Sequence, residues 1–210
     1  MTRIPIRRTD SERVQVGDYY DGIKRYFDQV SELTVVKVFS GEYYVTADQG
    51  EMLVTILGSC VSACIRDPEI NVGGMNHFLL PGVDGFSADS ARFGAFAMEQ
   101  LINEIIKLGG KKNRFEIKVF GGGNVTNSSA LIGDKNSEFV RSFLREEGLK
   151  IASEDLGGKQ PRRLHYFPDT GRVMVRKLSR REDMRIVDEE STYAQKAQKK
   201  NRKAELEMFT

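Results

Sequence analysis

The stretch TILGSCVSACIRDPEINVGGMNHFLLP, residues 55–81, decides how we expect this chain to fold. Two apolar runs, VSACIRD and VGGMNHFLL, flank turn-forming residues at 67–70, a pattern that predicts a β-hairpin. Residues 52–57 form a further apolar run that ends at Gly58 and Ser59, so we expect another strand immediately before the hairpin. The stretch also contains both cysteines of the 210-residue chain and one of its two histidines.

More strands are expected on both sides of this stretch. Alternating or apolar runs bounded by glycine predict two strands around Ser40 and Gly41 in residues 33–46, and single strands in residues 114–123 and 149–158. Residues 162–178 have the pattern of a hairpin that turns at residues 169–171.

Apolar residues at helical spacing predict helices in residues 18–33, 88–110 and 133–148. The expected inward stripes are Tyr20, Ile23, Tyr26, Phe27 and Val30 in the first helix, Phe93, Phe96, Ala97, Leu101, Ile105 and Leu108 in the second, and Phe139, Val140, Phe143 and Leu144 in the third.

The order of these elements predicts one α/β domain with a mixed, largely antiparallel sheet and helices packed on it. We place this domain at residues 33–180. Residues 1–32 form an N-terminal extension with the short helix, and residues 181–210 form a charged tail.

Composition narrows the class of protein. The 32 basic and 30 acidic residues nearly cancel, so a net charge of +2 gives no reason to expect a nucleic-acid partner. No apolar run approaches the roughly 20 residues of a membrane span, and the N-terminus has no apolar signal region. Two cysteines do not make a secreted disulfide framework. We therefore expect a reduced, cytoplasmic, soluble protein, and a monomer, because no apolar stripe is left unexplained.

The predicted hairpin has a chemical consequence. If the turn occupies residues 67–70, Arg66 pairs with Asn71, and Cys60 lies directly opposite His77. Opposed residues have Cβ atoms about 4.5–5.5 Å apart, close enough for a thiol and an imidazole to interact, whereas a slip of one residue would put them on opposite faces. A cysteine beside a histidine is the arrangement of an activated nucleophile, because an imidazolium lowers the thiol pKa.

Neighbouring groups complete this hypothesis. Backbone N–H groups around Gly58, Ser59 and Cys60 are candidates for an oxyanion hole. Thr55, in the preceding strand, is a candidate to orient the His77 ring, although a hydroxyl does not stabilise imidazolium as a carboxylate would.

Structural interpretations compete with these roles. A cysteine in an apolar run, such as Cys60 or Cys64, is often a small buried hydrophobe. We interpret Cys64 as core and His165 as a structural residue of its strand. A zinc site of Cys60, Cys64 and His77 fails, because four strand residues span about 13 Å and a Zn–S bond is about 2.3 Å. The run GGGN at residues 121–124 lacks the lysine of a phosphate-binding loop, so a turn close to the candidate site is favoured.

The motifs LGSCVSACIRD, GGMNHFLLP, KVFGGGNV and IGDKNSEFVRSFLREEGLKIASEDLGGKQPRRLHYFPDTGRVMVRKL occur in an order that resembles the CheD family of chemotaxis proteins. The resemblance runs from about Val36 to Leu178. It implies a deamidase of chemoreceptor glutamine side chains, with Cys60 as nucleophile, His77 as general base, Thr55 as third member, and no metal or organic cofactor. It also implies a layered α/β sandwich similar to the catalytic domains of cytotoxic necrotizing factor toxins.

The resemblance further implies methyl-accepting chemoreceptors as protein substrates and a CheC-type phosphatase as a partner. Two other functions stay open. One is an adaptor that binds receptors or the phosphatase with little catalysis, and the other is a cysteine hydrolase of a small amide, which a deep closed pocket would favour. The tail is either a solubilising segment or a tethered docking peptide that ends in AELEMFT.

Overall fold

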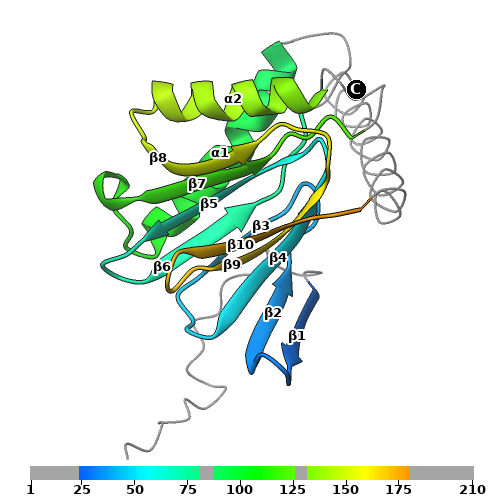
Figure 1. Cartoon of the computed structure of the whole chain (residues 1–210). Helices are drawn as coiled ribbons and strands as arrows, with labels where there is room; N and C mark the ends of the chain where they lie inside the picture. The colour runs from blue at the N-terminus through cyan, green and yellow to red at the C-terminus, as the bar shows by residue number, and fades with distance from the viewer. Residues whose placement is uncertain (1–23, 81–87, 126–131, 180–210) are drawn as a thin grey trace, which may run out of the picture.

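The computed structural model describes residues 24–80, 88–125 and 132–179, and the strands of these residues form two five-stranded sheets (Figure 1). The first sheet has the order β1-β2-β4-β9-β10, with strands Lys24–Asp28, Leu33–Lys37, Glu51–Leu57, Arg162–Phe167 and Arg172–Lys177. The second sheet has the order β3-β6-β5-β7-β8, with strands Tyr43–Thr46, Val72–Asn76, Val61–Asp67, Glu116–Gly121 and Ile151–Leu156. The strand predictions are confirmed, but the single sheet that we expected is two sheets.

Each sheet is mixed and largely antiparallel, as the sequence predicts. In the first sheet only β2 and β4 pair in parallel, and in the second only β7 and β8 do so. Helices α1 (Ala88–Lys107) and α2 (Ile132–Glu146) pack on the second sheet (Figure 1), and a short 3₁₀ helix spans Lys112–Arg114. The described chain is therefore α/β, with layers of helices, second sheet and first sheet.

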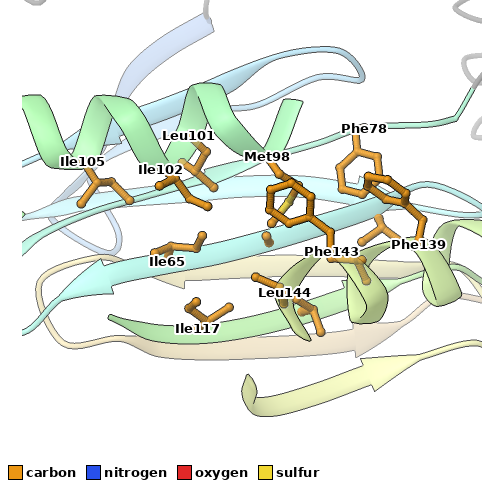
Figure 2. Close-up of a cluster of buried hydrophobic side chains, with 14 of the residues drawn as sticks. Ile65, Phe78, Met98, Leu101, Ile102, Ile105, Ile117, Phe139, Phe143 and Leu144 are labelled. Atoms are coloured by element: carbon orange, nitrogen blue, oxygen red, sulfur yellow. The ribbon is translucent and has the colours of Figure 1, made fainter. Parts of the chain in front are cut away.

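A large apolar core joins the helices to the second sheet (Figure 2). Phe78 packs edge-on against Phe139 of α2, with ring centroids 5.9 Å apart. Burying one such aromatic side chain contributes about 1.5–3 kcal/mol. The inward residues expected for α2 are confirmed: Phe139, Val140, Phe143 and Leu144 are all buried.

The inward face of α1 differs from the expected stripe. Leu101 and Ile105 are buried, as expected. Phe96 is 56% exposed, and Met98 and Ile102, which lie outside the expected stripe, are buried instead. Gly94 explains the shift, because a Cβ atom there would lie 2.6 Å from Leu80 and Phe139. A glycine therefore stands where a larger side chain would collide with the core.

A second apolar core fills the space between the two sheets. The first sheet contributes Val36, Leu53, Leu57, Leu164 and Tyr166, and the second contributes Tyr44, Cys64, Met75 and Phe120. Cys60 is part of this core and is completely buried. The candidate nucleophile therefore lies between the two sheets.

The helix expected over residues 18–33 is wrong where the structure describes it. Residues 24–28 form strand β1, which pairs with β2 from Asp28↔Leu33 to Lys24↔Lys37, and residues 18–23 lie outside the described part. Phe27 is 62% and Val30 95% exposed, so their helical spacing does not reflect a buried face. A tight turn closes this hairpin, with Glu32 at a φ of 56° and the Asp28 carboxylate accepting the Ser31 hydroxyl at 2.6 Å.

The expected boundaries at residues 32 and 180 stay predictions. The charged tail at 181–210 lies outside the described residues, as does most of the N-terminal extension. Within the described ranges, neither helix combines the length and the apolar character that a membrane crossing requires.

Candidate active site

Residues 58–60 carry the chain from one sheet to the other. Strand β4 of the first sheet ends at Leu57, and β5 of the second sheet begins at Val61. Cys60 is the last residue of this short crossing, which we call the nucleophile loop. Its position explains why a cysteine outside both strands is buried between the two sheets.

The glycine run at residues 121–124 holds the nucleophile loop by its backbone. The N–H of Gly122 donates to the Cys60 carbonyl, and the N–H of Gly123 donates to the Gly58 carbonyl, both at 2.7 Å. Gly121 has a φ of 112°, and a Cβ atom there would overlap the Cys60 carbonyl oxygen. Only glycine permits this approach. The glycine run lies beside Cys60, as expected, but it is the end of strand β7 and an irregular segment rather than a turn.

The register of the predicted hairpin is wrong by two residues. Asp67 pairs with Val72, and the isolated bridge between Val61 and Phe78 continues the same register, so Cys60 is opposite Leu79 rather than His77. The turn begins one residue later than expected, because the buried Asp67 carboxylate is bound in the strand by Arg114 and the Lys111 N–H. Asn71 closes the turn at a φ of 53°, a conformation that asparagine tolerates.

A shift of two keeps both side chains on one face of the sheet. His77 and Leu79 alternate with Phe78, so His77 lies diagonally across from Cys60, where backbone separations are about 7–8 Å. Leu79 and Cys60 both border the core between the sheets. Cys60 and His77 therefore face the same buried space, although they are not directly opposed.

His77 is fixed by a threonine from the opposite sheet. Thr55 Oγ1 lies 2.8 Å from His77 Nδ1, and the Thr55 hydroxyl donates to the Val38 carbonyl at 2.7 Å. Because a hydroxyl has only one proton to donate, Thr55 must accept the Nδ1–H of His77. This leaves Nε2 as the unprotonated nitrogen of the neutral ring.

Burial keeps the ring neutral. His77 is 5% exposed, and the cost of desolvating the charged form lowers its pKa to about 4, although the Val38 carbonyl raises it in part. Nε2 is buried and has no hydrogen-bond partner among the described residues. A neutral imidazole with an available nitrogen lone pair has the properties of a general base.

Ser40 is a neighbour of Cys60 that sequence reasoning missed. Its hydroxyl lies 3.8 Å from the Cys60 sulfur, in the turn between β2 and β3. The same turn is attached to the His77 backbone by two hydrogen bonds. The Gly41 N–H donates to the His77 carbonyl at 2.7 Å, and the His77 N–H donates to the Glu42 backbone carbonyl at 2.9 Å. Its sequence signal, a serine before a turn glycine, indicated the turn but not the contact.

The two structural interpretations agree with the geometry. Cys64 is buried on β5, and burial raises the pKa of its thiol to about 12, so the reactive thiolate form is disfavoured. His165 lies on β9 between Val54 of β4 and Met174 of β10, in the first sheet. Burial, and then the positive charges of Arg163 and Arg176, lower its pKa.

The family match and the most similar sequences point to the same family. The CheD family, described as chemotactic sensory transduction, matches residues 79–177. The chain is 50% identical over 203 residues to a protein of Rhodopseudomonas palustris named probable chemoreceptor glutamine deamidase CheD, covering 95% of each chain. A Bordetella parapertussis protein of the same name is 48% identical over 188 residues, covering 86% of this chain and 89% of that one.

This chain belongs to the CheD family. Among solved structures it is similar, at low TM-score, to the hypothetical protein YfiH of Bacillus licheniformis and to a DUF152 protein of Neisseria meningitidis. The first has a TM-score of 0.36 and 15% identity, covering 56% of this chain and 50% of that one. The second has a TM-score of 0.37 and 9% identity, covering 62% of this chain and 64% of that one. Neither is a cytotoxic necrotizing factor toxin.

Proposed function

We propose that this protein is a chemoreceptor glutamine deamidase with Cys60 as nucleophile. One observation carries the proposal: Thr55 binds Nδ1 of a neutral His77, so that Nε2 is the nitrogen available as base, on the face that Cys60 shares. Membership in a family whose relatives are named for this activity supplies the substrate class.

The proposed reaction begins with proton transfer from the Cys60 thiol to His77 Nε2. The sulfur attacks the side-chain amide carbon of a receptor glutamine, and N–H groups of the nucleophile loop, at Ser59 and Cys60, stabilise the oxyanion. His77 returns its proton to the amide nitrogen, ammonia leaves, and a thioester remains.

Hydrolysis of the thioester completes the cycle. His77 accepts a proton from water, whose oxygen attacks the thioester carbon. The intermediate collapses with release of the Cys60 sulfur, which recovers the proton. One water is consumed, one ammonia is released, and glutamine becomes glutamate. None of these steps uses a metal or organic cofactor.

The setting of this function follows the family resemblance. We propose that the protein acts in the cytoplasm as a monomer, on the cytoplasmic helices of chemoreceptors, and that a CheC-type phosphatase is a partner. The relation to the toxin catalytic domains also stays a prediction. The buried layer between two sheets is the feature that a comparison with those domains should examine.

The adaptor alternative has one observation in its favour. The Cys60 sulfur is completely buried, so a substrate glutamine reaches it only after neighbouring groups such as the Ser40 turn move aside. A protein that binds receptors without opening this site would act as an adaptor.

Intact mass of a chemoreceptor cytoplasmic fragment tests the proposal. Incubation with the wild-type protein should add about 1 Da per modified site, the change from amide to acid. Cys60→Ala should abolish the gain. Cys64→Ala should retain it, because Cys64 is equally buried but has no role in the proposed chemistry. Binding without a mass change would favour the adaptor.

A further inference from the structure

Asn136 links the nucleophile loop to the segment that follows His77. It lies on α2, and its side chain is completely buried. Its Nδ2 donates to the Ser59 carbonyl at 3.0 Å, and its Oδ1 accepts the Leu80 N–H at 2.9 Å. One amide thus binds the residue before Cys60 and a residue three positions after His77.

The link requires an amide side chain. The Ser59 carbonyl can only accept a hydrogen bond, and the Leu80 N–H can only donate one, so these partners fix which end of the amide faces each. Aspartate retains the acceptor but as a carboxylate loses the donor, and alanine loses both. A buried backbone group left without its partner is costly, so each loss should displace the backbone.

The hydrogen bond to the Ser59 carbonyl also sets the orientation of the Ser59–Cys60 peptide group. The described chain has no cis peptide bond, so the C=O and N–H of the Ser59–Cys60 peptide point in opposite directions. Asn136 binds that C=O and therefore fixes the direction of the Cys60 N–H. On the other side, Gly122 binds the Cys60 carbonyl. Both peptides that flank the nucleophile are therefore held in place.

We propose that Asn136 is a positioning residue that holds the nucleophile loop in place relative to His77 and orients the Cys60 N–H. The inference rests on the proposed function, since it assigns a role within that site. The hydrogen bonds of the Asn136 side chain go to backbone groups and not to the side chains of Cys60 or His77. It acts through the backbone of Ser59 and Leu80.

The test compares Asn136→Ala and Asn136→Asp with Val140→Ala. Val140 lies one turn further along α2 and is also completely buried, but it is apolar, so its loss loosens the same helix without removing a polar link. Each full-length variant is assayed for kcat and KM on the receptor fragment, well below its melting temperature. The His77 ring is titrated by NMR in parallel, a readout that needs no substrate.

We expect kcat to fall at least about tenfold in both Asn136 variants, with KM within about twofold of wild type. In Asn136→Asp the loss should diminish as the pH falls, because a protonated carboxyl can donate to Ser59 again. The His77 titration should move toward its ordinary range in Asn136→Ala. Val140→Ala should lower the melting temperature while retaining kcat and the His77 titration.

Equal kcat in Asn136→Ala and Val140→Ala, with the same His77 titration as wild type, would overturn the positioning role. If the wild-type protein does not deamidate the fragment, the proposed function fails, and the NMR arm decides alone. A displaced His77 titration in Asn136→Ala but not in Val140→Ala would then still support the link, and an unchanged one would overturn it.

Discussion

Thr55 lies in strand β4 of the first sheet and His77 directly follows strand β6 of the second, and the two side chains meet with 2.8 Å between Oγ1 and Nδ1. The hydroxyl fixes the tautomer of the ring without adding a charge to the buried layer between the sheets. The candidate base is therefore oriented by a neutral group and kept neutral by burial.

Replacing Thr55 separates orientation from packing. Thr55→Val preserves shape but removes the acceptor for the Nδ1–H, leaving a buried donor unpaired at a cost of about 1–3 kcal/mol. We expect kcat to fall about tenfold to a hundredfold. Thr55→Ser, which retains the hydroxyl, should recover most of the activity. Steady-state kinetics on the receptor fragment measure both, and equal activity of the valine and serine variants would contradict the assigned contact.

Burial of His77 predicts a loss of stability in acid. Its pKa is about 4 in the folded protein and about 6.5 when unfolded, so the unfolded state binds more protons between these values. The contribution of His77 to the free energy of unfolding is constant above pH 6.5. It declines as the pH falls toward 4, by about 3 kcal/mol at most. Urea unfolding at several pH values measures it.

His77→Gln should flatten this pH dependence relative to wild type. His165→Gln is the matched control, because His165 is half-buried and should contribute less in the same direction. A pH dependence that is identical in wild type and His77→Gln would show that His77 does not titrate as its burial implies.

Cys64 should behave as an inert thiol. Its pKa of about 12 lies above its ordinary value because of burial, so the thiolate is scarce at neutral pH. We expect an alkylating reagent to modify Cys64 only after unfolding, as measured by peptide mass. Modification of Cys64 in the folded protein, at the rate of an exposed thiol, would contradict its assignment to the core.

Gly121→Ala should disrupt the site through the backbone of Cys60. The new Cβ would overlap the Cys60 carbonyl, in addition to the strain of a φ of 112°. Gly148→Ala is the matched control, because Gly148 also has a positive φ, 67°, but no atom within 4 Å of its added Cβ.

Thermal unfolding and deamidation of both glycine variants distinguish clash from strain. We expect Gly148→Ala to lose about 1 kcal/mol of stability and no activity. Gly121→Ala should lose more stability and most of its activity. Similar effects of the two substitutions would argue against the close packing of the nucleophile loop.

Local sequence signals predict where the strands and helices lie better than they predict which elements pair with one another. Glycine turns and apolar runs identified the strands, and the motifs around Cys60 and His77 identified the candidate site. The division into two sheets could not be read from strand patterns, because a strand with one buried face has the same alternation in either sheet. The hairpin register depended on contacts of Asp67 with residues more than 40 positions away.

The residues that sequence reasoning missed share a physical reason. Ser40 and Asn136 are joined to the candidate site by contacts that span 20 residues or more, and no spacing pattern in the sequence singles out either one. The β1 strand was mistaken for a helix because its exposed aromatic residues happen to follow helical spacing. Whether such a set of side chains is buried or exposed distinguishes a buried helix face from this strand, and exposure is a property of the folded chain.

Because the chain crosses from one sheet to the other at residues 58–60, the candidate site is assembled from both sheets. The threonine comes from one layer, the histidine from the other, and the cysteine from the short link between them. The distances between the three side chains therefore depend on how the two sheets are aligned. A relative movement of the two sheets would change the separation of Thr55 from His77 even if none of the three residues were altered.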